Sequence, residues 1–169
     1  MMKRKKKILI RTMMMIGFLF LVGCDLANTP TAQVEEYLSK YQRLDKEISL
    51  DESFLIEEKD LDVSLKTKYQ ELLKKQYRNL SYAIKDEEIN GEKATVVVEI
   101  TVLDYGKEIR KLEEEKDLDY MKKLLERLKK VKKKVNYTIK FKVEQDENGK
   151  WKVKSLDRES QEKLAGIYS

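Results

Sequence analysis

The side chains that carry most enzyme chemistry are scarce in this chain of 169 residues, which has no histidine and a single cysteine, Cys24. Histidine is the commonest general base and the commonest metal ligand. One cysteine cannot form an internal disulfide or a thiolate cluster for zinc or iron–sulfur. A serine nucleophile would need a lysine or a carboxylate as its base, and no serine stands in a G-x-S-x-G pattern. We therefore expect a protein that is not an enzyme and that uses no metal and no cofactor.

Four polar residues are candidates for a small-ligand pocket. Asp104 ends a stretch rich in β-branched residues and Tyr105 follows it, while Tyr82 and Tyr137 lie in stretches that we expect to form neighbouring strands. If these side chains meet at the open end of a curved sheet, they form the polar floor of a pocket. The alternative, which we favour, is that Asp104 caps a turn and the tyrosines belong to the core. A hydrolase would need a second buried carboxylate facing Asp104, which the sequence does not display.

A run of lysines is the strongest charge feature after the N-terminal segment. Residues 107–134 hold 12 basic and 7 acidic side chains, and five of the last six residues are lysines: Lys129, Lys130, Lys132, Lys133 and Lys134. This run predicts contact with anionic lipid headgroups or with a phosphate-bearing wall polymer, at about 1 kcal/mol per basic residue near a membrane surface. High salt would weaken such contact. The alternative is a solvated helix end, where the helix dipole favours lysines.

The N-terminal segment has the composition of a targeting signal. Residues 1–12 are basic, and residues 13–23 form an apolar run of eleven residues, too short to span a membrane comfortably. Six of the 36 basic residues lie in 1–23, which has no acidic residue, so the rest of the chain has 30 basic against 31 acidic residues. The basic pI near 9.0 therefore belongs to this segment, and we expect no nucleic-acid partner.

The end of the apolar run, Leu21-Val22-Gly23-Cys24, resembles the lipobox of bacterial lipoproteins. The resemblance implies that residues 1–23 are a signal peptide, cleaved between Gly23 and Cys24. It also implies that Cys24 carries acyl chains such as palmitate, which anchor the protein in membrane lipid on the extracytoplasmic face of the bacterial cytoplasmic membrane. Residues 24–29 would then be a short tether. The alternatives are an ordinary signal peptide cleaved near Ala27 or an uncleaved anchor.

The elements that must position these residues follow from hydrophobic periodicity. Helical spacing or composition is found in four stretches: 30–48, 62–80, 107–134 with a break in phase near 113–117, and 157–168. Alternation with a period of two marks four strands: 80–84, 94–105, 137–143 and 151–153. The pairs Asn90-Gly91 and Asn148-Gly149 are hairpin signals. Residues 49–62 are acidic, and we expect a loop there with a turn or two of helix.

This order predicts one α+β domain over residues 30–169. Its N-terminal helices pack on a curved antiparallel sheet of about four strands, with residues 107–134 as a helical insert between the strand pairs. The stretches A-T-V-V-V-E-I-T-V and D-E-N-G-K-W-K-V-K-S-L resemble small bacterial lipoproteins with a cystatin-like or nuclear-transport-factor-two-like domain. Most such proteins have no known biochemical role, so the resemblance implies a fold and a location.

The function that these features predict is a membrane-anchored envelope lipoprotein that binds without catalysis. Its partner would be a protein or an anionic envelope polymer, met by the helical insert. The alternative is a small-ligand binder that uses the open end of the cone-shaped sheet, and a hydrolase ranks third.

Overall fold

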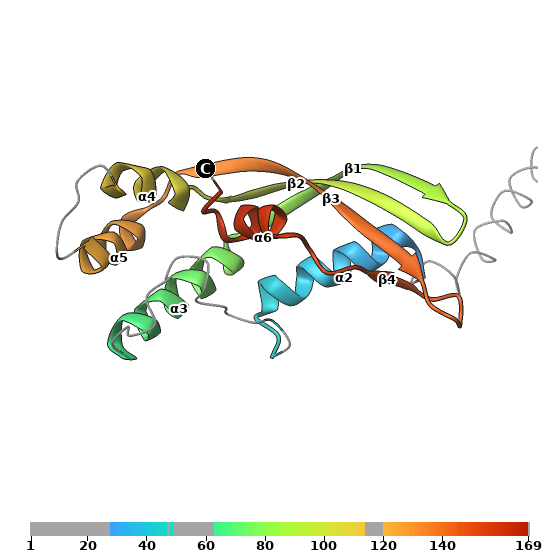
Figure 1. The fold of residues 1–169 in the computed structure, drawn as a ribbon, viewed down its shortest axis with the longest axis horizontal. Helices are drawn as coiled ribbons and strands as arrows, with labels where there is room; N and C mark the ends of the chain where they lie inside the picture. The colour runs from blue at the N-terminus through green and yellow to red at the C-terminus, as the bar shows by residue number, and fades with distance from the viewer. Residues whose placement is uncertain (1–27, 47, 49–62, 114–119, 169) are drawn as a thin grey trace, which may run out of the picture.

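The computed structural model describes residues 28–46, 48, 63–113 and 120–168, so the lipobox, most of the tether and the segment 49–62 lie outside the described residues. It has the α+β architecture expected from the sequence (Figure 1). The elements are, in chain order, α2 (Pro30–Arg43), α3 (Val63–Arg78), β1 (Ser81–Asn90), β2 (Lys93–Leu103), α4 (Tyr105–Glu113), α5 (Tyr120–Lys130), β3 (Lys134–Gln145), β4 (Trp151–Val153) and α6 (Arg158–Ala165).

The four strands form one antiparallel sheet in the order β1-β2-β3-β4. The Asn-Gly turns join β1 to β2 and β3 to β4, with Gly91 at φ 61° and Gly149 at φ 73°, so both hairpin predictions are confirmed. The helices α4 and α5 are inserted between β2 and β3. The insert leaves and re-enters the sheet at one point, because Leu103 and Lys134 are paired across the two strands.

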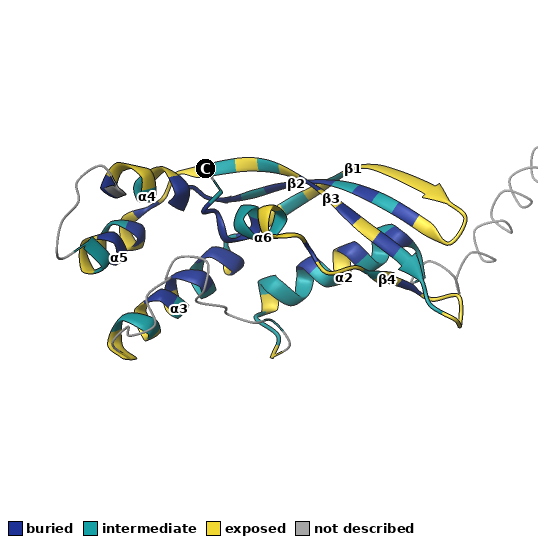
Figure 2. Cartoon of the chain, in the orientation of Figure 1, coloured by how far each residue is buried: buried dark blue, intermediate teal, exposed yellow. Residues whose placement is uncertain are grey.

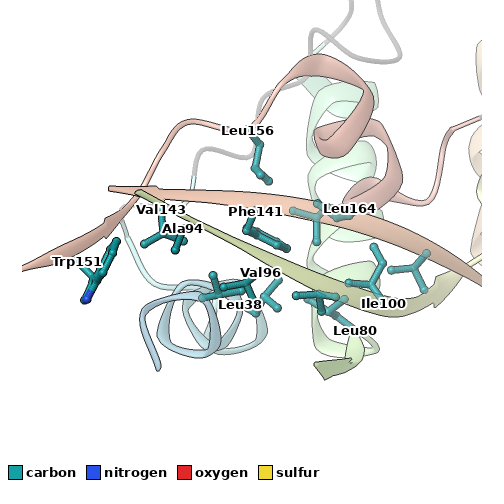
Figure 3. Packing of buried hydrophobic residues seen from close by; sticks show 14 residues of the cluster. Leu38, Leu80, Ala94, Val96, Ile100, Phe141, Val143, Trp151, Leu156 and Leu164 are labelled. Atoms are coloured by element: carbon teal, nitrogen blue, oxygen red, sulfur yellow. The ribbon is translucent and has the colours of Figure 1, made fainter. Parts of the chain in front are cut away.

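A first core lies between the sheet and the helices α2 and α6. Alternate residues of β2 (Val96, Val98, Ile100) are fully buried, as the period-two pattern predicts. They pack with Phe141 and with Leu38 of α2 (Figure 3). In Figure 1 the helices α2, α3 and α6 lie on this side of the sheet, and no labelled element covers its other face.

A second core fills the end of the molecule beyond the sheet, where α3, α4 and α5 pack together. Its fully or almost fully buried members include Tyr69, Leu73, Leu112, Leu124 and Leu128. Figure 2 shows these helices with buried residues facing one another and exposed residues turned outward. The described residues therefore form two neighbouring hydrophobic clusters, joined where α3 and α6 meet the end of β2.

Gln76 of α3 joins these two clusters. β1 begins at Ser81, opposite Thr101, and so stops short of Leu103. The Gln76 side chain stands where that strand would continue: Oε1 accepts from the Leu103 N–H (2.7 Å), and Nε2 donates to the Leu103 carbonyl (2.8 Å). Nε2 also donates to the carbonyl of Ala165 at the end of α6 (2.8 Å). Gln76 is fully buried, and its amide binds three backbone groups from two other elements.

The strands expected over 80–84 and 137–143 are longer in the structure, at Ser81–Asn90 and Lys134–Gln145. Three other predicted boundaries were wrong because of a local cap. The first helix was expected to reach residue 48 but ends at Arg43, because Leu44 adopts a left-handed conformation (φ 56°) and its N–H caps the helix. The strand expected over 94–105 ends at Leu103, since Asp104 caps α4, which begins at Tyr105. The C-terminal helix expected over 157–168 spans Arg158–Ala165 and ends at Gly166, with φ 70°. The predicted N-terminus of α2 is confirmed, with Thr29 as its cap and a proline in its first turn.

Candidate functional site

The lysine run lies where α5 ends and β3 begins. Lys129 and Lys130 close α5, and Lys134 opens β3. All five side chains of the run are exposed. Lys133 lies 3.8 Å from Asp104, and the described residues place no carboxylate within ion-pair distance of the other four. The run therefore presents a surface of positive charge that this part of the chain leaves largely uncompensated.

Two lysines bind backbone carbonyls at the ends of the two helices. Lys75 of α3 donates from Nζ to the carbonyls of Lys129 (2.9 Å) and Val131 (3.1 Å), at the C-terminus of α5. Lys134 donates in turn to the carbonyl of Asn79 (3.3 Å), just beyond the end of α3. The last carbonyls of a helix have no partner within it, and cations are favoured there. These bonds fix the two helix ends side by side and add the Lys75 ammonium to the lysine run.

A groove of about 360 Å³ runs between α3 and α5 and reaches the lysine run at Lys129. Two leucines, Leu72 and Leu125, line it between charged residues; the rest of its lining is Thr67, Lys68, Glu71, Lys75, Glu126 and Lys129. Glu71 accepts from Lys74 (2.6 Å), and this bond lowers the pKa of the Glu71 carboxyl below its usual value. The groove thus combines an apolar part with three lysines on its rim.

The structure brings together only part of the predicted pocket. Tyr82 of β1 and Tyr137 of β3 are both paired with Ile100 of β2. They therefore lie on either side of Ile100, on the helix-covered face of the sheet. Tyr137 donates to the carbonyl of Tyr168 (3.0 Å). Burial, and then the charge of Asp104, raise the pKa of Tyr137. Burial also raises the pKa of Tyr82, and a hydrogen bond with Ser39 acts in the opposite direction.

Asp104 and Tyr105 have structural partners instead. Asp104 accepts from the Lys107 N–H (3.2 Å), three residues on, which is the bond of a helix N-cap. Tyr105 is buried in the second core and donates to the carbonyl of Leu72 (3.2 Å). Burial raises its pKa. The Asp104 cap and the buried Tyr105 agree with the alternative interpretation given above, in which these residues serve the fold.

One serine and one lysine have the S-x-x-K spacing in α6, Ser160 and Lys163. The Lys163 ammonium contacts Glu159 and lies 4.8 Å from the centroid of the Tyr168 ring. Its position is therefore explained by an ion pair and a cation–π contact.

The groove was not found from the sequence. Its two walls come from helices about fifty residues apart, so no local pattern marks it. The only signal was the helical spacing of Leu72 and Leu125, which predicted burial but not their common neighbourhood.

Comparisons with protein-family models, with curated proteins and with solved structures found no match to this chain. None of the helices in the described ranges combines the length and the apolar composition needed to cross a membrane. The same residues contain no group of three or more metal-ligating side chains that could hold an ion.

Proposed function

We propose that this protein is a lipid-anchored envelope module that binds an anionic envelope polymer through the lysine run and has no catalytic role. Acylated Cys24 would hold it on the extracytoplasmic face of the bacterial cytoplasmic membrane. The observation that carries the proposal is the group of four lysines without carboxylate partners among the described residues (Lys129, Lys130, Lys132 and Lys134), next to the groove between α3 and α5.

The kind of side chain favours a polyanion over a protein partner. Protein interfaces are enriched in Tyr, Trp and Arg and depleted in Lys. The exposed surface of the run is made of lysines. Because a lysine ammonium is a point charge on a flexible side chain, it suits a ligand that carries many repeated negative charges. A protein partner is the alternative outcome of the experiments below.

The direct test is the binding of polyphosphate to the full-length chain, compared with the variant Lys130→Gln/Lys132→Gln. The control, Lys93→Gln/Lys150→Gln, removes the same charge at the opposite end of the sheet. We expect the first variant to bind about thirtyfold more weakly, since each of the two basic residues contributes about 1 kcal/mol at an anionic surface and about 1.4 kcal/mol is a factor of ten in affinity. Wild-type binding should also fall between about 0.1 M and about 1 M salt, as the Debye length falls from about 10 Å to about 3 Å. Equal losses in both variants would refute the assignment.

Crosslinking in cells identifies the natural partner. The full-length protein and its Cys24→Ala variant would be crosslinked and purified, and the attached material analysed by mass spectrometry. A polymer attached at residues 129–134 only in the anchored protein supports the proposal. A single protein attached there makes the module an adaptor of an envelope complex.

A small anionic ligand with an apolar part is the second candidate. The groove volume of about 360 Å³ supports it, since small-molecule sites range from about 300 to about 1,000 Å³. A ligand that raises the melting temperature of the wild-type protein, but not of Lys68→Glu, would lie in the groove, because Lys68 is exposed on its lining.

A further inference from the structure

The outer face of the sheet carries four further lysines beside Lys134, the last member of the lysine run. The period-two alternation of β3 turns its apolar residues toward the core and Lys134, Lys140 and Lys142 toward solvent. In β4, Lys152 stands opposite Glu144 in the strand register and therefore on the same outer face, and Lys154 follows two residues later. These five residues are the outer lysines. By the alternation of the strand, Lys134, Lys140 and Lys142 lie on the face of β3 that no labelled helix covers (Figure 1), whereas Lys152 of β4 also borders α2.

Positive charge dominates this half of the face. Lys152 pairs with Asp146 (3.0 Å) and Lys154 with Glu144 (3.1 Å). Lys140 and Lys142 are exposed, and no carboxylate in the described ranges lies within ion-pair distance of either. The acidic outward residues Asp86 and Glu88 belong to β1, at the other edge of the sheet. The face is therefore divided into a basic side along β3 and β4 and an acidic edge along β1.

The outer lysines begin at the point where the N-terminal segment leaves the domain. Asn28 is held at the β3–β4 turn by two hydrogen bonds, one from its Nδ2 to the carbonyl of Gly149 (3.1 Å) and one to its Oδ1 from the Trp151 N–H (3.0 Å). Cys24 stands four residues earlier, a distance of at most about 14 Å. From this end to Lys134 the lysines extend along the twelve residues of β3, or about 36 Å.

We propose that the outer face of β3 and β4 is a binding surface for anionic lipid headgroups of the same bilayer that holds Cys24. The inference rests on the anchoring part of the proposed function. A tether of about 14 Å keeps the Asn28 end close to the headgroups, so contact of the adjoining lysines with lipid is intramolecular and needs little affinity of its own. A soluble polymer has no such advantage at this face. The protein then lies along the membrane, and the groove between α3 and α5 faces the envelope.

The test is residue-resolved labelling of lysines. The full-length chain, purified from the membranes of an expressing bacterium, is reconstituted into phosphatidylcholine vesicles with or without phosphatidylglycerol. It is then treated with a membrane-impermeant amine reagent, and mass spectrometry compares Lys140 and Lys142 with two exposed helical lysines, Lys122 and Lys130. We expect the labelling of Lys140 and Lys142 to slow by about tenfold in anionic vesicles only, and to recover at about 1 M salt. Lys122 and Lys130 should react equally in both vesicles.

A variant and a flotation measurement separate the possible failures. Lys154, on the same face, should also be labelled more slowly in anionic vesicles. This protection should be lost in Lys140→Gln/Lys142→Gln and kept in Lys122→Gln/Lys130→Gln. If the chain floats with the vesicles while Lys140 and Lys142 stay as reactive as in neutral lipid, or if Lys122 and Lys130 are protected instead, the inference is wrong and the anchor stands. A chain that does not float with either kind of vesicle overturns both.

Discussion

Replacing Gln76 with leucine tests whether one side-chain amide closes the end of the sheet. Leucine has nearly the same volume but no donor or acceptor, so the N–H and C=O of Leu103 and the C=O of Ala165 lose a buried partner. A buried polar group left without its partner costs about 1–3 kcal/mol. The burial of the leucine side chain offsets about 2 kcal/mol of this cost. Three such groups cost about 3–9 kcal/mol together, so we expect a net loss of about 1–7 kcal/mol, centred near 4 kcal/mol, from the free energy of unfolding, which is a large share of the roughly 5–15 kcal/mol typical of a domain.

Equilibrium unfolding in urea, followed by circular dichroism and by the fluorescence of Trp151, measures this loss. The midpoint should fall without a change in the slope m, because the surface exposed on unfolding stays the same. The matched control is Gln42→Leu, which removes a single, partly buried bond to the carbonyl of Leu80 (2.9 Å) and should cost about 1 kcal/mol or less. If the two variants lose the same free energy, the reasoning about Gln76 is refuted.

The variant Gln76→Glu adds a pH dependence to the same test. The introduced carboxyl would face the Leu103 and Ala165 carbonyls in a buried site, so its pKa in the folded state should rise above the usual value of about 4.3. When protonated it donates one hydrogen bond, and when ionised it donates none. We expect the free energy of unfolding that Gln76→Glu loses relative to the wild type to be smallest below about pH 4. This loss should grow as the pH rises through the folded-state pKa of the introduced carboxyl. A penalty that does not vary with pH would contradict this account.

The other predictions concern caps, glycines and buried tyrosines. Gly166→Ala should cost well over 2 kcal/mol, since the strained φ of 70° alone costs about 1–2 kcal/mol and the new Cβ would lie 2.2 Å from the Leu103 carbonyl oxygen. Gly149→Ala has a similar φ but open space, so urea unfolding should show only the strain of about 1–2 kcal/mol. Asp157 caps α6, and the hydrogen bond with Ser160 lowers its pKa below 3.8. Asp157→Ala should therefore cost about 1 kcal/mol at neutral pH, and its urea midpoint should converge with that of the wild type as the pH falls below 3.8 and through the lowered pKa of Asp157. Burial raises the pKa of Tyr105 above 10, so stability should decline as the pH rises above that value. Tyr105→Phe should make this alkaline decline shallower in urea midpoints measured from pH of about 9 to 11.

Much of the fold could be predicted because its signals are local. Alternation in β2 and β3 and the two Asn-Gly turns indicated an antiparallel sheet, and the return to helical composition indicated the insert. The end of α2 could not be predicted, because its left-handed cap is Leu44 rather than glycine, and Leu44 and Ile48 continue the apolar spacing since they pack on the second core. β1 extends to Asn90 through exposed, charged residues, and its pairing with β2 explains the extra length.

The candidate site could be predicted only where its residues are neighbours in the sequence. The lysine run is contiguous in the sequence, and it is contiguous in the structure. The groove and the Lys75 bonds depend on the packing of α3 against α5, which periodicity does not specify. Tyr105 was expected at a pocket because the strand was extended two residues too far. The change from strand to helix at Asp104 turns this side chain into the second core.

The pairing of Leu103 with Lys134 has a consequence for how this chain varies and folds. The thirty residues between them form an insertion whose two ends lie side by side in the sheet. Doubling the length of such a loop costs only about 0.6 kcal/mol of closure entropy, so the sheet register should tolerate insertions and deletions in the segment between α4 and α5. Because of this insertion, the pairing of β2 with β3 joins residues that are farther apart in the sequence than those of the other two strand pairs. Early formation of the α4–α5 hairpin would shorten that search.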